Sequence, residues 1–127
     1  MARMIDFFVD TNILIYILER YPHPAVSYIS QFSLGISVIT EIELLGKKNI
    51  TEQETNIIQS LLKDCEIIDF NNSVKEIAIS IKQNCSVELA DSIIAATAKS
   101  FNLPLVTADK DFKKIKDADI VILDLNK

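Results

Sequence analysis

One stretch, Phe7-Phe8-Val9-Asp10-Thr11-Asn12, decides how the fold of this sequence is interpreted. Residues 5–9 are apolar except for Asp6, which predicts a buried strand, and the strand then ends in a carboxylate, a hydroxyl and an amide. In an open α/β sheet, ligands bind at the carboxyl ends of the strands. The polar triplet is therefore either a cap between strand and helix or the first part of an active site. Taken alone, it favours the cap.

Short apolar segments and helical segments alternate along the rest of the chain. The predicted strands are residues 4–9, 34–37, 66–70, 104–107 and 120–123. The predicted helices are residues 13–19, 25–32, 38–47 and 52–63, a helix capped by Asn71 or Asn72, and a long helix capped by Ser86 that ends near residue 102. Thr51 and Glu54 form a capping-box sequence. This alternation predicts a three-layer α/β/α sandwich with a short, mainly parallel five-stranded sheet.

Length and composition predict one domain, residues 1–127, in the cytoplasm. Hydrophobic residues make up 49% of the chain and charged residues 24%, which is ordinary for a globular protein. No apolar run approaches the roughly 18 residues of a membrane span, and the start, residues 1–6, has no signal-peptide pattern. The formal net charge of -5 argues against a broad basic surface for nucleic acid, although a metal site can still bind one.

Histidine and cysteine offer no catalytic or metal site. His23 is the one histidine, and Cys65 and Cys85 lack metal-ligand spacing, so we expect two reduced thiols. Acid–base or metal chemistry must therefore use carboxylates.

The long predicted helix places one carboxylate at its core boundary. At 100° per residue, Asp91 lies between the two sides of the helix, beside Ala95 and Ala98. It is either the wall of a cleft or a boundary residue that meets solvent. The predicted core side is Leu89, Ala90, Ile93, Ile94, Thr97 and Phe101, and the predicted water side is Glu88, Ser92 and Lys99.

Further carboxylates lie near other strand ends. Glu41 and Glu43 follow the second strand, and helical periodicity does not decide which of them turns inward. After the fourth strand, Asp109 either joins a site or caps a short helical turn that buries Phe112. Asp69, at the end of the third strand, is a rival site residue.

Several carboxylates at one sheet edge would need cations. Two charges about 5 Å apart repel by roughly 3 kcal/mol at an effective dielectric constant near 20. Such a cluster is stable with bound cations or with raised pKa values. Ligands that are all oxygen select Mg²⁺ or Mn²⁺ over zinc.

Four segments together resemble the PIN-domain ribonucleases, and their order and spacing are most similar to the VapC-type toxins of toxin–antitoxin pairs. The segments are residues 8–14 (FVDTNIL), 36–44 (ISVITEIEL), 89–98 (LADSIIAATA) and 105–112 (LVTADKDF). The resemblance implies that the metal ligands and catalytic residues are Asp10, Glu43, Asp91 and Asp109. It implies supporting roles for Thr11, Asn12, Ser37, Thr40, Thr107 and, at a variable spacing, Asp111.

By this resemblance, the chain is expected to be a Mg²⁺- or Mn²⁺-dependent endoribonuclease. A metal-activated water would hydrolyse RNA at the four-carboxylate site and so inhibit translation. The resemblance also implies an antitoxin that blocks the site, and a homodimer. The helices between Ala25 and Leu62 are the candidate surface for the antitoxin.

Two alternatives remain. A receiver or phosphotransfer module would carry its aspartyl nucleophile at Asp69, or would need an aspartate where this chain has Asn12. A catalytically silent PIN-like scaffold would bind without cleaving.

Overall fold

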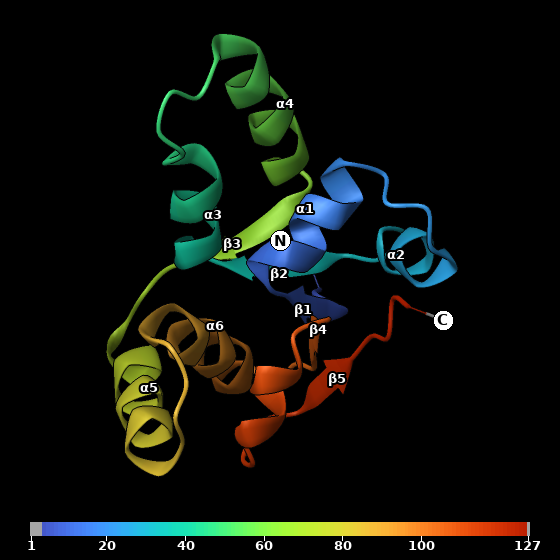
Figure 1. Cartoon of the computed structure of the whole chain (residues 1–127). Coiled ribbons are helices and arrows are strands. Elements are labelled where there is room, and N and C mark those ends of the chain that lie inside the picture. The colour runs from blue at the N-terminus through green and yellow to red at the C-terminus, as the bar shows by residue number, and fades with distance from the viewer. Residues whose placement is uncertain (1–3, 127) are drawn as a thin grey trace.

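A five-stranded parallel sheet lies in the middle of the protein, between two layers of helices (Figure 1). The strand order in this computed structural model is β3-β2-β1-β4-β5, so β1 occupies the centre. The strands are β1 (Phe7–Val9), β2 (Leu34–Ser37), β3 (Cys65–Ile68), β4 (Leu105–Thr107) and β5 (Ile120–Ile122). Since all five strands run in the same direction, their carboxyl ends share one edge of the sheet.

The helices cover both faces of the sheet. Helices α1 to α4 supply the apolar cluster on one face, and α5 and α6 supply the cluster on the other. The helices are α1 (Thr11–Leu18), α2 (Pro24–Ile29), α3 (Val38–Leu45), α4 (Glu52–Leu62), α5 (Asn72–Asn84) and α6 (Leu89–Ser100), with a 3-10 helix, η1 (Lys110–Lys114), before β5. The predicted three-layer sandwich is therefore confirmed.

Alternation along the central strands explains why both layers are needed. Phe8 and Leu105 belong to the cluster under α5 and α6, whereas Val9 and Val106 belong to the cluster under α1 to α4. All four side chains are fully buried. A strand covered on both faces reads as a continuous apolar run rather than as an alternating one.

The described residues are 4–126. Residues 1–3, part of the start that lacks a signal-peptide pattern, and residue 127 lie outside them. Within residues 4–126, every helix is too short or too polar to cross a membrane.

Helix α6 differs from its prediction. It begins at Leu89 with Glu88 rather than Ser86 at the N-cap, and no side chain caps it. Ser92 is fully buried, whereas Leu89 and Phe101 are 66% and 48% exposed, which reverses the predicted sides for these three residues. The Ser92 hydroxyl donates to the Leu89 carbonyl at 2.6 Å, so its burial leaves no unpaired donor. Small side chains allow α6 to pack closely between α5 and the sheet.

Candidate active site

Asp10 lies at the carboxyl end of the central strand, and two hydrogen bonds hold its carboxylate. As the N-cap of α1, it accepts from the Ile13 N–H through Oδ1 at 2.9 Å. Its Oδ2 accepts from the Thr107 hydroxyl at 2.5 Å. The residue is 4% exposed. The cap interpretation of the polar triplet is therefore confirmed, and the cap is also a buried carboxylate at the edge where parallel strands end.

Thr107 joins this carboxylate to the end of the neighbouring strand. Its hydroxyl donates to Asp10 and accepts from the Asp109 N–H at 3.0 Å. Asp109 in turn accepts from the Asp111 N–H at 2.9 Å and so caps η1, with Phe112 buried. The predicted short helical turn is confirmed. Because β1 and β4 are adjacent and parallel, both aspartates reach the same edge.

Glu43 is brought to this edge by α3. Thr11 donates to Glu43 Oε1 at 2.6 Å, and its hydroxyl lies 3.0 Å from that of Thr40, which is fully buried. One hydroxyl pair therefore connects α1 to α3 and orients the glutamate. Glu41 faces a different hollow, between α3 and α4. Glu43, although exposed, is therefore the glutamate of α3 that turns toward α1, as the resemblance implies.

The four carboxylates line one cavity of about 210 Å³, which we call the acidic cavity. Asp10 follows β1, Glu43 lies on α3, Asp91 lies in the first turn of α6, and Asp109 precedes η1. Its lining is Asp10, Thr11, Asn12, Glu43, Glu88, Asp91, Ile94, Asp109 and Phe112.

Burial and mutual repulsion perturb two of these groups. Desolvation raises the pKa of Asp10; hydrogen bonds from Thr107 and Ile13 oppose this rise, and the charges of Asp109 and Glu43 add to it. For Asp91, desolvation followed by the charges of neighbouring carboxylates raises the pKa to about 6. The negative charge of each carboxylate therefore opposes ionisation of its neighbours, and a bound cation would relieve this repulsion.

The donor set suits a hard divalent cation. Its ligands would all be carboxylate oxygens, which Mg²⁺ and Mn²⁺ prefer. Among residues 4–126, no three His, Cys, Asp or Glu side chains stand at the spacing that would hold an ion without moving. The carboxylates would therefore have to draw closer around a cation. The residues fit a divalent ion by their chemistry and by their shared cavity.

The sequence match decides the family. Residues 7–118 match the PIN domain. The chain belongs to the PIN domain family. The resemblance that was inferred from four short segments is therefore confirmed over most of the chain.

Solved structures similar to this PIN domain include toxin–antitoxin complexes. A toxin–antitoxin complex from Klebsiella pneumoniae is 28% identical, with a TM-score of 0.69 over 91% of this chain and 96% of that chain. VapBC-1 from nontypeable Haemophilus influenzae is 26% identical, with a TM-score of 0.74 over 91% and 96%. DNA-bound VapBC from Salmonella typhimurium, at 23% identity and a TM-score of 0.79 over 94% and 98%, shows the fold alone. No curated protein sequence matches this PIN domain.

The predicted supporting residues lie at different depths around the PIN-domain cavity. Thr11 and Asn12 line it, and Thr40 and Thr107 lie behind it as buried hydroxyls. The remaining supporting residue of the second segment, Ser37, is fully buried and caps α3 by accepting from the Ile39 N–H at 3.0 Å.

Two candidate acids lie outside the acidic cavity. Asp111 is exposed, and its carboxylate lies 3.7 Å from Lys114 Nζ. Asp69 is exposed beyond the end of β3, which is an edge strand. The structure brings neither carboxylate to the cavity.

Glu88 is a cavity residue that the sequence interpretation placed on the water side. It lines the acidic cavity, and its charge contributes to the raised pKa of Asp91. The spacing contained a usable signal, because residues three apart on a helix are neighbours. The uncertain start of α6 hid it, since an N-cap residue has no fixed place in a helical periodicity.

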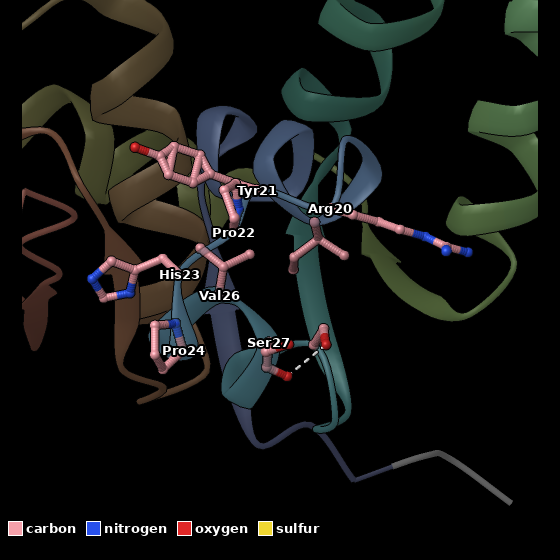
Figure 2. Close-up of a pocket in the computed structure, with 9 residues that line it drawn as sticks. Arg20, Tyr21, Pro22, His23, Pro24, Val26 and Ser27 are labelled. Atoms are coloured by element: carbon pink, nitrogen blue, oxygen red, sulfur yellow. Dashed lines mark hydrogen bonds between the residues drawn. The ribbon is translucent and has the colours of Figure 1, made fainter.

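A larger hollow of about 570 Å³ lies away from the carboxylates, between the end of α1 and α2. Figure 2 shows Tyr21 and His23 on one side of it and the Arg20 side chain extending away on the other. His23 caps α2 by accepting from the Ala25 N–H through Nδ1 at 3.0 Å. Size alone therefore does not identify the site in this PIN domain; the convergence of carboxylates does.

Proposed function

We propose that this chain is a Mg²⁺- or Mn²⁺-dependent endoribonuclease, with one PIN domain formed by residues 1–127. The observation that carries the proposal is the acidic cavity, in which five carboxylates from four parts of the chain line one space. PIN domains are nucleases as a family, which supports phosphodiester hydrolysis. Asp10, Glu43, Asp91 and Asp109 would hold the ion.

Each side chain of the site has a defined task in this proposal. When bound, the divalent ion supplies charge stabilisation for the phosphodiester and a water nucleophile at neutral pH. Thr107 fixes the rotamer of Asp10, and Thr11 fixes that of Glu43, so two ligands are preorganised by buried or half-buried hydroxyls. Asn12, exposed at the rim, can donate an amide N–H to a phosphate oxygen.

The likeness to toxin–antitoxin complexes supports a role as the toxin of such a pair. RNA is the substrate we propose, with slowed translation as the result and an antitoxin protein as the inhibitor. Exposed apolar side chains in the helices between Ala25 and Leu62 support the antitoxin surface there: Tyr28, Ile42 and Ile57 are 58%, 60% and 50% exposed. We also propose a homodimer, which sedimentation of the purified chain would test.

The position of Asp69 separates the proposed ribonuclease from the alternative of a receiver module. A receiver would place its phosphate acceptor in the acidic cavity, whereas Asp69 is outside it. The test measures RNA cleavage by Asp91→Asn, which changes a cavity residue. Two control variants, Asp69→Asn and Glu41→Gln, change acids that lie outside the cavity. With Mn²⁺ and an RNA substrate, we expect Asp91→Asn to lower the cleavage rate by more than about 100-fold, beyond the usual effect of outer-shell changes.

Both control variants should cleave as the wild type does, leaving 5′-phosphate and 3′-hydroxyl ends. Loss of activity in Asp69→Asn with an active Asp91→Asn would favour the receiver. A wild-type chain that is free of antitoxin and cleaves no RNA with Mn²⁺ would instead be a binding scaffold.

A further inference from the structure

Lysines gather in one part of the chain, although the chain as a whole is acidic. Residues 99–116 contain five lysines and two aspartates, a local charge of +3, whereas the whole chain carries -5. The lysines are Lys99, Lys110, Lys113, Lys114 and Lys116. Because the overall charge opposes a broad basic surface, any contact with a polyanion must be concentrated locally, and this segment is where cations are dense.

The geometry of η1 fixes part of this group on the surface. A 3-10 helix repeats every three residues, so side chains at i and i+3 lie in line. Phe112 and Ile115 form the buried line, at 2% and 4% exposure. Lys110 and Lys113 form a second line, which is exposed. Lys114 lies on the remaining line of side chains and is exposed too. The buried line anchors η1 and keeps the lysines in solvent.

Three of the lysines line one hollow. A cavity of about 260 Å³ between α5 and the end of η1 is lined by Lys99, Lys114 and Lys116, and also by Glu76 and Asp117. We call it the lysine groove. Lys114 Nζ lies 3.7 Å from Asp111 Oδ1 and 3.4 Å from the Ser86 carbonyl oxygen. In the described part of the chain, neither Lys99 nor Lys116 makes an ion pair, so no carboxylate contacts these two ammonium groups directly.

Two elements lead from the acidic cavity to the lysine groove. Helix α6 carries Asp91 in its first turn and Lys99 in its last, about 12 Å apart at 1.5 Å per residue. Helix η1 begins after Asp109 and ends at Lys114, about 10 Å away at 2 Å per residue. The groove is therefore within reach of a polymer whose scissile phosphate lies in the acidic cavity.

We propose that the lysine groove binds the sugar–phosphate backbone of single-stranded RNA, a few nucleotides from the bond that is cut. This inference rests on the proposed ribonuclease function. A lysine ammonium is a compact charge that contacts phosphate without reading bases. The lysine groove would attract the RNA backbone and so offset its repulsion by the acidic cavity. RNA binding in the groove would not depend on the base sequence.

The test compares two triple variants with the same change in charge. The groove variant combines Lys99→Gln, Lys114→Gln and Lys116→Gln, and the control combines Lys48→Gln, Lys63→Gln and Lys75→Gln, which are exposed elsewhere. Both are made with Asp91→Asn to prevent cleavage. Binding of a labelled single-stranded RNA of about 15 nucleotides is measured over a range of salt concentrations, with melting temperatures as a check on folding.

We expect the groove variant to lose about 100-fold in affinity near 0.1 M salt, with a salt slope smaller by about 2, because each phosphate contact contributes about 0.7. The control should change little. With Asp91 intact, the groove variant should raise KM for long RNA and cleave a dinucleotide as the wild type does. The single variant Lys116→Gln, at an exposed position of the groove, should show a third of the slope change.

Equal losses in both triple variants, an unchanged slope in the groove variant, or no RNA binding by the parent chain would each overturn the proposal. Loss of antitoxin binding with unchanged RNA binding would overturn it too and would assign the groove to a protein. If the groove binds RNA but the wild-type chain cleaves none, the proposal for the groove would stand and the proposed ribonuclease function would be wrong.

Discussion

At the scale of single residues, Thr107 links the two aspartates that follow β1 and β4 in the acidic cavity. Its hydroxyl donates to the buried Asp10 carboxylate and accepts from the Asp109 N–H, so one group orders the ends of two strands. A buried hydroxyl with both functions is costly to remove, since each partner would lose its hydrogen bond.

We predict that Thr107→Val, which keeps the shape and removes the hydroxyl, lowers the free energy of unfolding by about 1–3 kcal/mol. It should also weaken Mn²⁺ binding by about 10–100-fold, as loss of an outer-shell partner does. Urea denaturation and a Mn²⁺ titration measure the two effects. Thr107→Ser keeps the hydroxyl and is the control; a valine variant that binds Mn²⁺ as the wild type does would contradict the role.

The raised pKa of Asp91 predicts a pH dependence in metal-free protein. Burial and neighbouring carboxylates raise this pKa to about 6 from the model-peptide 3.8, so the folded state binds more protons than the unfolded state between these values. The free energy of unfolding should therefore fall as pH rises from about 4 to about 6 and level off above that range. Asp10, whose pKa is also raised, acts in the same direction.

Asp91→Asn should reduce this fall, because the amide does not ionise. Thermal unfolding in EDTA at several pH values, for wild type and variant, measures it. Parallel pH profiles of the two proteins would contradict the raised pKa.

At the scale of elements, the side chains of Phe8 and Ile5 leave little room for a side chain at Gly35 of β2. A Cβ at Gly35 would lie 3.0 Å from Phe8 Cδ2 and 3.1 Å from Ile5 Cγ2. We predict that Gly35→Ala costs about 1–3 kcal/mol through overpacking of the central strand. The control, two residues earlier, is Ser33→Ala: the Ser33 hydroxyl is buried and has no hydrogen-bond partner within residues 4–126.

Removing that hydroxyl should leave stability unchanged or raise it by up to about 1 kcal/mol. Urea denaturation of both variants and of the wild type measures these changes in the free energy of unfolding. Equal stability of Gly35→Ala and the wild type would show that the Phe8 and Ile5 side chains can shift without cost, which would contradict the prediction.

At the scale of the whole molecule, the acidic cavity links stability to divalent cations. A ligand that binds the folded state alone stabilises it, by about 2.7 kcal/mol at 100 times its Kd. Millimolar Mg²⁺ or Mn²⁺ should therefore raise the melting temperature, and Asp10→Asn should reduce the gain. Scanning calorimetry with each ion, and with EDTA, measures this. An unchanged wild-type melting temperature would count against a cation site.

The sequence predicted the layers and most element boundaries because these depend on local patterns. Thr51 and Glu54 form the predicted capping box, and Asn71 caps α5 as one of the two expected residues. Periodicity was wrong for three residues of α6, since Ser92 is buried whereas Leu89 and Phe101 are exposed, and it was right for Ile94 and Thr97, which are buried. A helix packed on two sides selects small residues for close approach, and hydropathy does not record that preference.

By itself, then, the sequence predicted the parallel sheet and the carboxylates at its strand ends, because the alternation of strand and helix segments and the polar residues after each strand can be seen locally in the chain. Local patterns could not tell which carboxylates meet; the family resemblance named four of them, and the tertiary structure places these four at one cavity. It turned Glu43 rather than Glu41 toward α1, added Glu88 to the cavity, and left Asp69 and Asp111 outside. These choices depend on crossings such as that of Thr11 with α3, and on the order β3-β2-β1-β4-β5, which brings Asp10 beside Asp109 although 99 positions separate them in the chain.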